Sequence, residues 1–276
     1  MKDQPSPADF VTKMTPAVYR AAELARLLEG TVVNTPKLGE RTAVKQALTE
    51  ADTRVQEIIL SELYEHFSTV ALAAEEETPG VERFPAQGES LVIIDPIDGT
   101  LHSYLEKRGP YAVIVGLALG GELKSALVAL PREGVLFRGS LGAGAETLGS
   151  EKVAERASAT ADGDVILVSH NVPDPIRLAL SAEGLEVVPA CGGAVAVAPL
   201  IEGVRAGLRL ADRANATGIS IRGRVGLVIA REAGVSILGD RGQTFPVNLD
   251  EPHWALTLAA DESDQSMLQR IIGSHG

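Results

Sequence analysis

Residues 92–100 constrain the fold of this chain more than any other segment. Their sequence, Val-Ile-Ile-Asp-Pro-Ile-Asp-Gly-Thr, predicts an apolar strand that runs into a Pro/Gly turn with two carboxylates three residues apart, Asp95 and Asp98. Such a strand end aims both side chains, and the backbone carbonyl between them, at one point beyond the sheet. Mg²⁺ prefers a few carboxylates with water and substrate phosphate, and the Gly99 and Thr100 amides favour phosphate if they open a helix. The segment therefore predicts a combined metal and phosphate site.

The composition indicates a folded chain with a large core. Its 276 residues are 45% hydrophobic, which suffices for one or two domains. A net charge of −12 argues against nucleic acid or an anionic membrane as the main partner, because both attract basic surfaces. The charge does not exclude a small anionic substrate, because a bound metal reverses the local sign.

The sequence carries no sign of export or membrane insertion. No apolar stretch approaches the roughly 20 residues that a membrane span needs. The N-terminus lacks the basic-then-apolar pattern of a signal peptide, and the single cysteine, Cys191, excludes an intramolecular disulfide. We therefore expect a cytoplasmic protein in which Cys191 is a small buried residue.

The expected elements divide the chain into two halves. Residues 1–15 read as loose, and helices and strands follow them up to residue 139. A Gly-, Ala-, Ser- and Thr-rich stretch over 139–164 predicts a domain boundary. We place an α+β domain with the acidic motifs over 1–150 and an α/β domain that completes the cleft over 151–276, where strands alternate with helices, one of them over 194–202.

A second acidic pair follows another predicted strand. Glu75 and Glu76 come directly after the apolar residues 70–74. Both acidic groups are therefore placed to meet at one edge of a sheet. The alternative for this pair is a solvated acidic surface run, and for Asp95 and Asp98 an ordinary helix-capping turn.

Residues 95–100 match the signature of the inositol monophosphatase superfamily, which also includes bisphosphate nucleotidases and fructose bisphosphatases. Other segments resemble the family in the same order: Thr-Glu-Ala-Asp at 49–52, Glu-Glu at 75–76, Pro-Tyr-Ala-Val at 110–113, a glycine hairpin at 141–145 and Arg-Glu-Ala-Gly at 231–234. The resemblance covers nearly the whole chain. It implies a five-layer αβαβα sandwich, of mixed α+β and α/β character, and Mg²⁺-dependent hydrolysis of a small phosphate monoester.

The resemblance also implies a ligand set. Glu75, Asp95 and the Ile97 carbonyl would hold a first Mg²⁺, and Asp95 with Asp98 would hold a second. In such two-metal sites one ion lowers the pKa of a water and the other stabilises the leaving oxygen.

Further roles follow from the same resemblance. Thr100, hydrogen-bonded toward Asp52, would orient the attacking water, so that Asp52, Glu75 and Thr100 form the expected catalytic set. The Gly99 and Thr100 amides would receive the phosphate, and Gly193 and Ala194 would contact the substrate. No covalent phospho-enzyme is expected, and the family's habit suggests a homodimer.

The sequence departs from the family pattern at the last metal ligand. Counting back from Glu-Ala-Gly at 232–234 places Arg222 where the family carries an aspartate. An arginine cannot serve as a ligand, so it would repel a second metal or contact the phosphate directly as a fork. We therefore expect one Mg²⁺ site and leave the second open, with Asp212 as a substitute ligand if its loop folds back.

The substrate pocket departs as well. The acidic residue that would grip polyol hydroxyls aligns with Ala211, and His102 near the signature is either a substrate contact or a solvated loop histidine. The sequence thus favours a phosphatase with an altered metal site for an inositol-, sugar- or nucleotide-phosphate-like substrate. The alternatives are a phosphatase-like protein that binds a phosphorylated ligand or partner without hydrolysis, and a diverged enzyme that uses Arg222 as an anion clamp.

Overall fold

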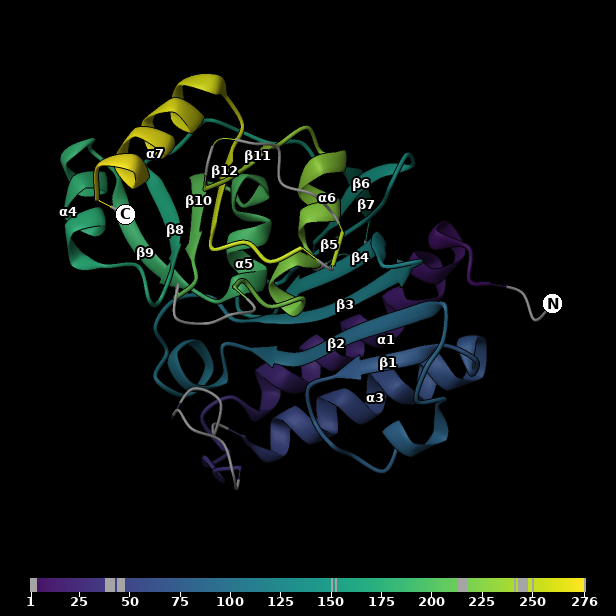
Figure 1. The fold of residues 1–276 in the computed structure, drawn as a ribbon. Coiled ribbons are helices and arrows are strands. Elements are labelled where there is room, and N and C mark those ends of the chain that lie inside the picture. Colours follow the sequence, from purple (N-terminus) through teal and green to yellow (C-terminus); the bar gives the residue numbers. More distant parts are fainter. Residues whose placement is uncertain are drawn as a thin grey trace.

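The structure, a computed structural model, describes residues 4–37, 43, 48–149, 151, 153–212, 218–240, 242, 248–249 and 251–275. Two sheets alternate with three layers of helices, which confirms the predicted five-layer sandwich (Figure 1). Helices α1 (Pro7–Leu28) and α3 (Glu50–Phe67) form the first layer. No helix among these residues is long and apolar enough to cross a membrane.

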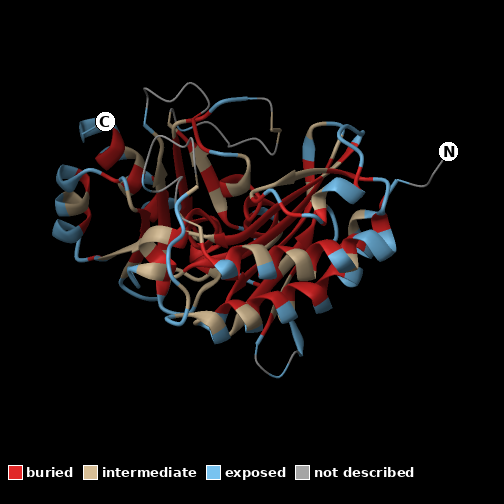
Figure 2. Cartoon of the chain, turned by 90° about the horizontal axis from the view of Figure 1, so that it is seen from below, coloured by how far each residue is buried: buried red, intermediate tan, exposed pale blue. Residues whose placement is uncertain are grey.

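The first helical layer packs one apolar face on the larger sheet. Buried and exposed residues alternate along α1 and α3, as expected of helices with one buried face (Figure 2). The prediction that residues 1–15 are loose is wrong from Pro7 onward. Pro7 suits a first helical turn, and Phe10 and Met14 are fully buried against the sheet, which offsets the hydrogen bond lost at Pro16 inside the helix.

The larger sheet has seven strands in sequence order. Strands β1 and β2 are parallel and all other neighbours are antiparallel. Its apolar residues alternate between the two faces; Ile94 and Val113 face α1 and α3, whereas Ile93 and Ile114 face the second sheet. The strands are β1 (Ala71–Ala74), β2 (Ser90–Asp98), β3 (Ala112–Leu119), β4 (Glu122–Leu130), β5 (Val135–Ser140), β6 (Gly144–Leu148) and β7 (Ala154–Arg156).

Strands β6 and β7 lie within the stretch 139–164, where we expected a domain boundary. All three residues of β7 are exposed, so this edge strand carries no apolar alternation for sequence reasoning to detect. Glu232 at the end of α6 (Leu227–Glu232) accepts hydrogen bonds from the Gly142 and Gly144 amides and so ties the β5–β6 turn to the middle layer. The division into domains at residue 150 stays a prediction.

The smaller sheet has the strand order β11-β12-β10-β8-β9, in which β8 is parallel to both neighbours and β12 antiparallel to both of its own. Helices α5 (Gly192–Ala196) and α6 lie between the two sheets, and α4 (Asp174–Ala182) and α7 (Glu262–His275) cover the outer face. The strands are β8 (Val165–Ser169), β9 (Glu186–Ala190), β10 (Val204–Leu210), β11 (Ser236–Gly239) and β12 (Ala255–Ala259).

The predicted helix over 194–202 is wrong in its extent. Helix α5 ends at Ala196, and a 3-10 turn over Ala198–Leu200 follows it. Pro199 explains the break, because proline has no amide hydrogen for the α-helical bond. Other short turns lie at Val81–Arg83, at Thr100–Leu105 with π-helical bonding, and at Arg222–Arg224.

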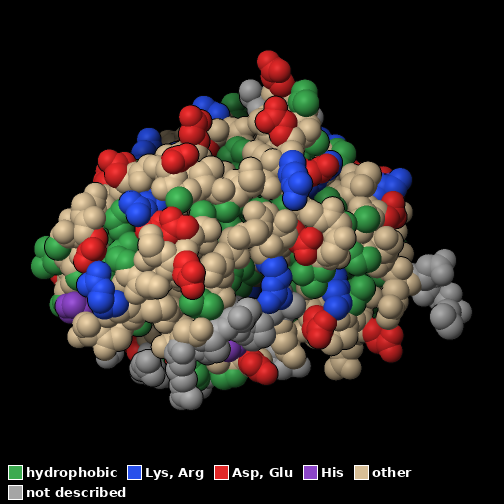
Figure 3. All heavy atoms as spheres, turned by 90° about the horizontal axis from the view of Figure 1, so that it is seen from above, with side chains coloured by type: hydrophobic (Ala, Val, Ile, Leu, Met, Phe, Trp, Pro, Cys, Tyr) green, Lys and Arg blue, Asp and Glu red, His purple; other side chains and the backbone are tan. Residues whose placement is uncertain are grey.

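Charged side chains of both signs are interspersed on the face seen in Figure 3. That face therefore shows no large patch of a single sign.

Gly109 joins the two sheets at the edge where the acidic residues lie. Its φ of +74° is left-handed, and a Cβ on it would lie 1.7 Å from the Pro189 carbonyl oxygen at the end of β9. We expect Gly109→Ala to lower the free energy of unfolding by about 3 kcal/mol or more, because backbone must move to relieve the clash.

Gly120→Ala is the matched control for this prediction. Gly120 also has a left-handed φ, +58°, but open space beyond it, so only the cost of the backbone conformation, about 1–2 kcal/mol, applies. The two unfolding free energies are compared by urea denaturation, and equal losses would contradict the role of Gly109 as a contact between the sheets.

Candidate active site

Parallel pairing of β1 and β2 brings the two acidic motifs together. The register pairs Ala74 with Ile94, so Glu75 and Asp95 leave adjacent strands side by side. Asp95 is only 4% exposed. Burial, followed by the charges of Glu75 and Asp98, raises the pKa of Asp95 well above its ordinary value. The structure thus confines several carboxylates in one poorly solvated place.

A bulge in β2 puts Asp98 on the same side as Asp95. In a regular strand, residues three apart point to opposite faces. Here Asp95 pairs with Ile114 and Asp98 with Ala112, so β2 uses one residue more than its partner between these pairs. A bulge of this kind reverses the alternation and re-aims the side chains that follow it. The Pro96-Ile97 insertion therefore gathers both aspartates at one edge.

Gly99 turns the chain immediately after the second aspartate. Its φ is +93°, and a Cβ there would lie 2.8 Å from the Cβ of Cys191. Only glycine satisfies both demands. The predicted phosphate-binding residues Gly99 and Thr100 line the same cleft as the carboxylates.

Asp98 is held by groups from the second half of the chain. The Gly193 amide donates to Asp98 Oδ2 over 2.5 Å, and the buried Cys191 thiol helps to lower the pKa of the same carboxyl group. Burial still raises the pKa of Asp98, although the nearby Arg209 charge opposes the shift. The Ala194 amide donates to Cys191 Sγ over 3.4 Å. The amides of Gly193 and Ala194, predicted to contact substrate, thus have partners within the protein, and their role stays a prediction.

Thr100 and Asp52 form the pair that the sequence predicted. Thr100 Oγ1 lies 2.9 Å from Asp52 Oδ1 and 2.8 Å from the Ile97 carbonyl oxygen. Asp52 is fully buried and accepts on Oδ2 from the amide and the hydroxyl of Thr49, each at 2.7 Å, in a capping box at the start of α3. Burial raises the pKa of Asp52, and the Thr49 and Thr100 hydrogen bonds oppose the rise.

The residues present fit one divalent cation. Glu75 Oε2 and Asp95 Oδ1 are buried oxygens without a hydrogen-bond partner. Buried carboxylates rarely stay unpartnered, because each lost bond to water costs free energy. An oxygen-rich donor set of two or three carboxylates and the Ile97 carbonyl matches what Mg²⁺ takes in proteins. A separate acidic group, Glu62, Glu65 and His66 on α3, lies on the surface, where Arg20 pairs with Glu62.

Arg222 lies where a further carboxylate ligand was expected. Its Nη2 donates to the Ala74 carbonyl over 2.9 Å, directly before Glu75, and its Nε is buried without a partner. Its charge lowers the pKa of Asp95, against the larger effect of burial. A guanidinium brings positive charge and no lone pair, so Arg222 cannot serve as a ligand for a second cation.

Sequence reasoning missed Arg209. It lies on β10 and lines the cleft with Glu75, Asp95 and Asp98. Alternation along β10 carries the signal, because Ala206 and Leu208 pack outward under α4 and α7, which turns Gly207 and Arg209 inward. Ala211, which the resemblance aligned with the family's acidic residue, follows the end of β10 and lines the same cleft, and that alignment stays a prediction.

Two histidines stand at the mouth of the cleft. The rings of His102 and His170 lie 4.8 Å apart, and His170 Nε2 is 3.1 Å from Ser103 Oγ. Burial lowers the pKa of His170 to about 4, so this ring is neutral near pH 7. His102 Nδ1 lies 2.9 Å from Glu106. Asp212 also lines the cleft, and its role as a substitute ligand stays a prediction because residues 213–217 lie outside the described part.

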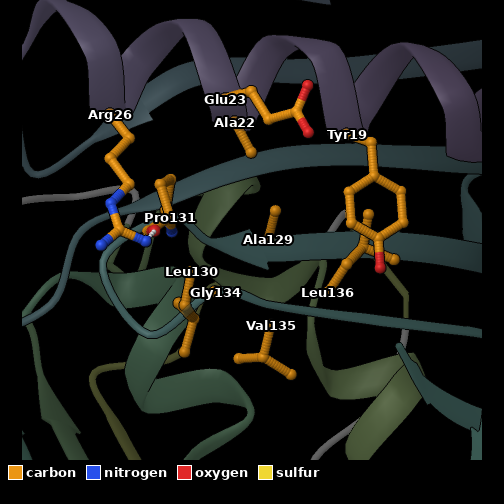
Figure 4. Close-up of a pocket in the computed structure, with 10 residues that line it drawn as sticks. All are labelled: Tyr19, Ala22, Glu23, Arg26, Ala129, Leu130, Pro131, Gly134, Val135 and Leu136. Atoms are coloured by element: carbon orange, nitrogen blue, oxygen red, sulfur yellow. Dashed lines mark hydrogen bonds between the residues drawn. The ribbon is translucent and has the colours of Figure 1, made fainter. Parts of the chain in front are cut away.

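The cleft has a volume of about 640 Å³, enough for a small phosphorylated molecule. A smaller pocket of about 170 Å³ lies between α1 and the β4–β5 hairpin (Figure 4). Its lining is mostly apolar, and Arg26 there donates to the Pro131 carbonyl over 3.3 Å. The carboxylates described above do not line that pocket, so the cleft between the sheets is the candidate active site.

Comparisons with known proteins agree with this geometry. The mouse inositol monophosphatase 2 is 28% identical over 167 residues, 60% of this chain and 57% of the mouse protein. The human inositol monophosphatase 2 is 29% identical over 129 residues, 47% of this chain and 44% of the human protein. The chain thus spans about half of the length of the curated relatives that it matches.

Solved structures share the fold over nearly the whole chain. The extragenic suppressor protein suhB from Bartonella henselae superposes with a TM-score of 0.72 at 18% identity and covers 97% of this chain and 99% of its own. The IMPase of Thermotoga maritima has a TM-score of 0.70 at 19% identity, with 94% of each chain covered. At these identities the likeness shows the fold alone.

A sequence model of the inositol monophosphatase family gives stronger evidence for the family of this chain. The model matches residues 10–197. These residues include Asp52, Glu75 and the turn over 95–100 and end before Arg209 and Arg222. Because this match covers more than half of the sequence, the chain belongs to the inositol monophosphatase family.

Proposed function

We propose that this protein hydrolyses a small phosphate monoester with one bound Mg²⁺. The observation that carries the proposal is the pair of buried, unpartnered oxygens, Glu75 Oε2 and Asp95 Oδ1, in a cleft that also holds the Thr100–Asp52 pair. Membership of the inositol monophosphatase family supports the reaction class. The substrate is an inositol-, sugar- or nucleotide-phosphate-like molecule small enough for the cleft.

Glu75, Asp95, the Ile97 carbonyl and Asp98 are the proposed ligands. A bound Mg²⁺ would polarise the phosphate and lower the pKa of a nearby water. The pairing of β1 with the mostly buried strand β2 positions Glu75 beside Asp95, and the Gly193 amide holds Asp98. Gly99 and Thr100 line the same cleft as these carboxylates, and their amides are proposed to donate hydrogen bonds to the phosphate oxygens.

Thr100 and Asp52 orient the attacking water. The Thr100 hydroxyl has one proton, and donation to Asp52 leaves its lone pairs free to accept from that water. Asp52 cannot turn away, because Thr49 holds its other oxygen from two sides. The pair therefore presents an acceptor of fixed direction to the water proton.

Arg222 takes over part of what a second cation would do. Its fixed charge opposes the repulsion among the carboxylates, and its bond to the Ala74 carbonyl holds the end of β1 from which Glu75 projects. This arrangement favours a single-cation site.

The homodimer and the cytoplasmic location stay predictions.

A second candidate is a phosphatase-like protein that binds a phosphorylated ligand without hydrolysing it. Arg222 favours this candidate, because loss of a cation that stabilises the leaving oxygen lowers the reaction rate. A loss of about 4 kcal/mol of transition-state stabilisation lowers the rate about a thousandfold. Turnover distinguishes the two candidates, since only the enzyme releases phosphate.

The first prediction concerns the cation. With Mg²⁺ or Mn²⁺ the folded protein releases phosphate from at least one member of a panel of inositol, sugar and nucleotide monophosphates. Asp95→Asn lowers this rate about a thousandfold or more, because it removes a ligand charge. Mg²⁺ raises the melting temperature of the wild type, since it binds the folded state, and it raises that of Asp95→Asn much less.

Glu65→Gln serves as the control for Asp95→Asn, because it changes the acidic surface group on α3 and leaves the cleft intact. It is expected to match the wild type in both measurements. Phosphate release with Asp95→Asn at the wild-type rate would refute the ligand assignment. Mg²⁺ binding without turnover of any ester would favour the non-hydrolytic candidate.

The second prediction concerns the water. Thr100→Val keeps the size of the side chain but removes the hydroxyl, so kcat falls about a hundredfold or more. Thr100→Ser retains the hydroxyl and most of kcat. Mg²⁺ affinity, measured by calorimetry, changes little in either variant. Equal kcat for the Val and Ser variants would rule out the proposed role of the hydroxyl.

A further inference from the structure

Arg209 occupies a slot that two glycines create. A Cβ on Gly192 would lie 1.6 Å from its Nη1, and a Cβ on Gly223 would lie 1.9 Å from the same atom. Any other residue at either position would expel the guanidinium. Gly192 precedes the amide that holds Asp98, and Gly223 directly follows Arg222. The fold therefore fixes this arginine between the two halves of the active-site machinery.

The guanidinium has little to bind in the protein. Nη1 is buried without a hydrogen-bond partner, and the one bond of Nη2 is a long contact of 3.5 Å to Ser220 Oγ. Among the residues that the structure describes, no carboxylate lies within ion-pair distance of Arg209. A partly buried arginine without a carboxylate is costly, because its charge has lost water and gained no counter-ion.

Asp98, which lines the same cleft as Arg209, already has another partner. It accepts from the Gly193 amide and belongs to the proposed cation site. Arg209 thus adds a positive charge to the cleft wall. The carboxylates do not pair with this charge, and binding of polyol hydroxyls, which the family resemblance implies, does not require it. An arginine fork matches the geometry of a carboxylate or a phosphate, whereas it is a poor match for neutral hydroxyls.

We propose that Arg209 binds a second anionic group of the substrate, so that the preferred substrate is a phosphate monoester that also carries a carboxylate or another phosphate. This inference rests on the proposed function, in which the cation and the Gly99–Thr100 turn bind the phosphate that is hydrolysed. Arg209 is then a specificity residue: it selects a doubly anionic substrate and takes no part in the chemical step.

Non-hydrolysable phosphonates test the inference without requiring turnover. Isothermal titration in Mg²⁺ compares propylphosphonate, 3-phosphonopropanoate and propane-1,3-diphosphonate, which share a three-carbon chain and differ in the second group. The wild type is expected to bind at least one doubly anionic ligand about tenfold or more tightly than propylphosphonate, as one charge-assisted bidentate contact allows. The tighter of the two identifies the second group as carboxylate or phosphate.

Variants at Arg209 separate its contribution to the affinity for a doubly anionic ligand from Mg²⁺ chelation by the ligand and from the general charge of the protein. Arg209→Gln is expected to abolish the excess affinity for the doubly anionic ligand and to leave propylphosphonate binding within about twofold; that binding also reports that the variant is folded. Arg209→Lys keeps the charge without the fork and retains part of the preference. Arg270→Gln, which removes an exposed charge on α7, retains all of it.

The outcomes separate this inference from the function on which it rests. Equal affinity of the wild type for all three phosphonates, or an equal loss across all three in Arg209→Gln, overturns the role of Arg209 and leaves the phosphate site intact. Absence of any phosphonate binding, together with absence of ester turnover, overturns both.

Discussion

The parallel pairing of β1 with β2 is the constraint on which the site depends. It pairs Ala74 with Ile94, so that Glu75 and Asp95 follow side by side, and the bulge at Pro96-Ile97 adds Asp98 on the same side. Three carboxylates in one poorly solvated place repel one another and lose hydration, which raises the pKa of both aspartates. Such a cluster is stable only where the fold holds it rigidly and where positive charge comes to it.

That positive charge reaches the cleft from two directions. Arg222 approaches from behind β1 and Arg209 from β10, and each lowers the pKa of one aspartate against the larger effect of burial. Neither arginine forms an ion pair within the described residues, so both retain the capacity to act on a bound anion. The site therefore combines the carboxylates of the proposed cation site with two guanidinium groups, and so it differs from a site built of carboxylates alone.

Much of the fold and of the acid cluster followed from local patterns. The strand before Asp95 and the glycine turn after Asp98 are signals within a few residues, and both formed where the sequence predicted them. The errors fell where the pattern was weak or contradicted. Residues 7–15, which were predicted to be loose, belong to α1 and bury Phe10 and Met14, and the exposed strand β7 showed no alternation.

The sequence by itself determined the family, the layered fold and the identity of the residues that approach one another at the strand ends, because those features rest on short spacings and on apolar periodicity. Tertiary structure alone decided the partners of each group. Arg222 reaches the Ala74 carbonyl across 148 positions of sequence, Gly193 reaches Asp98 across 95, and Arg209 enters the cleft only because glycines from two other segments leave it room. Contacts of that kind depend on how sheets and helices pack, and local sequence patterns do not predict that packing.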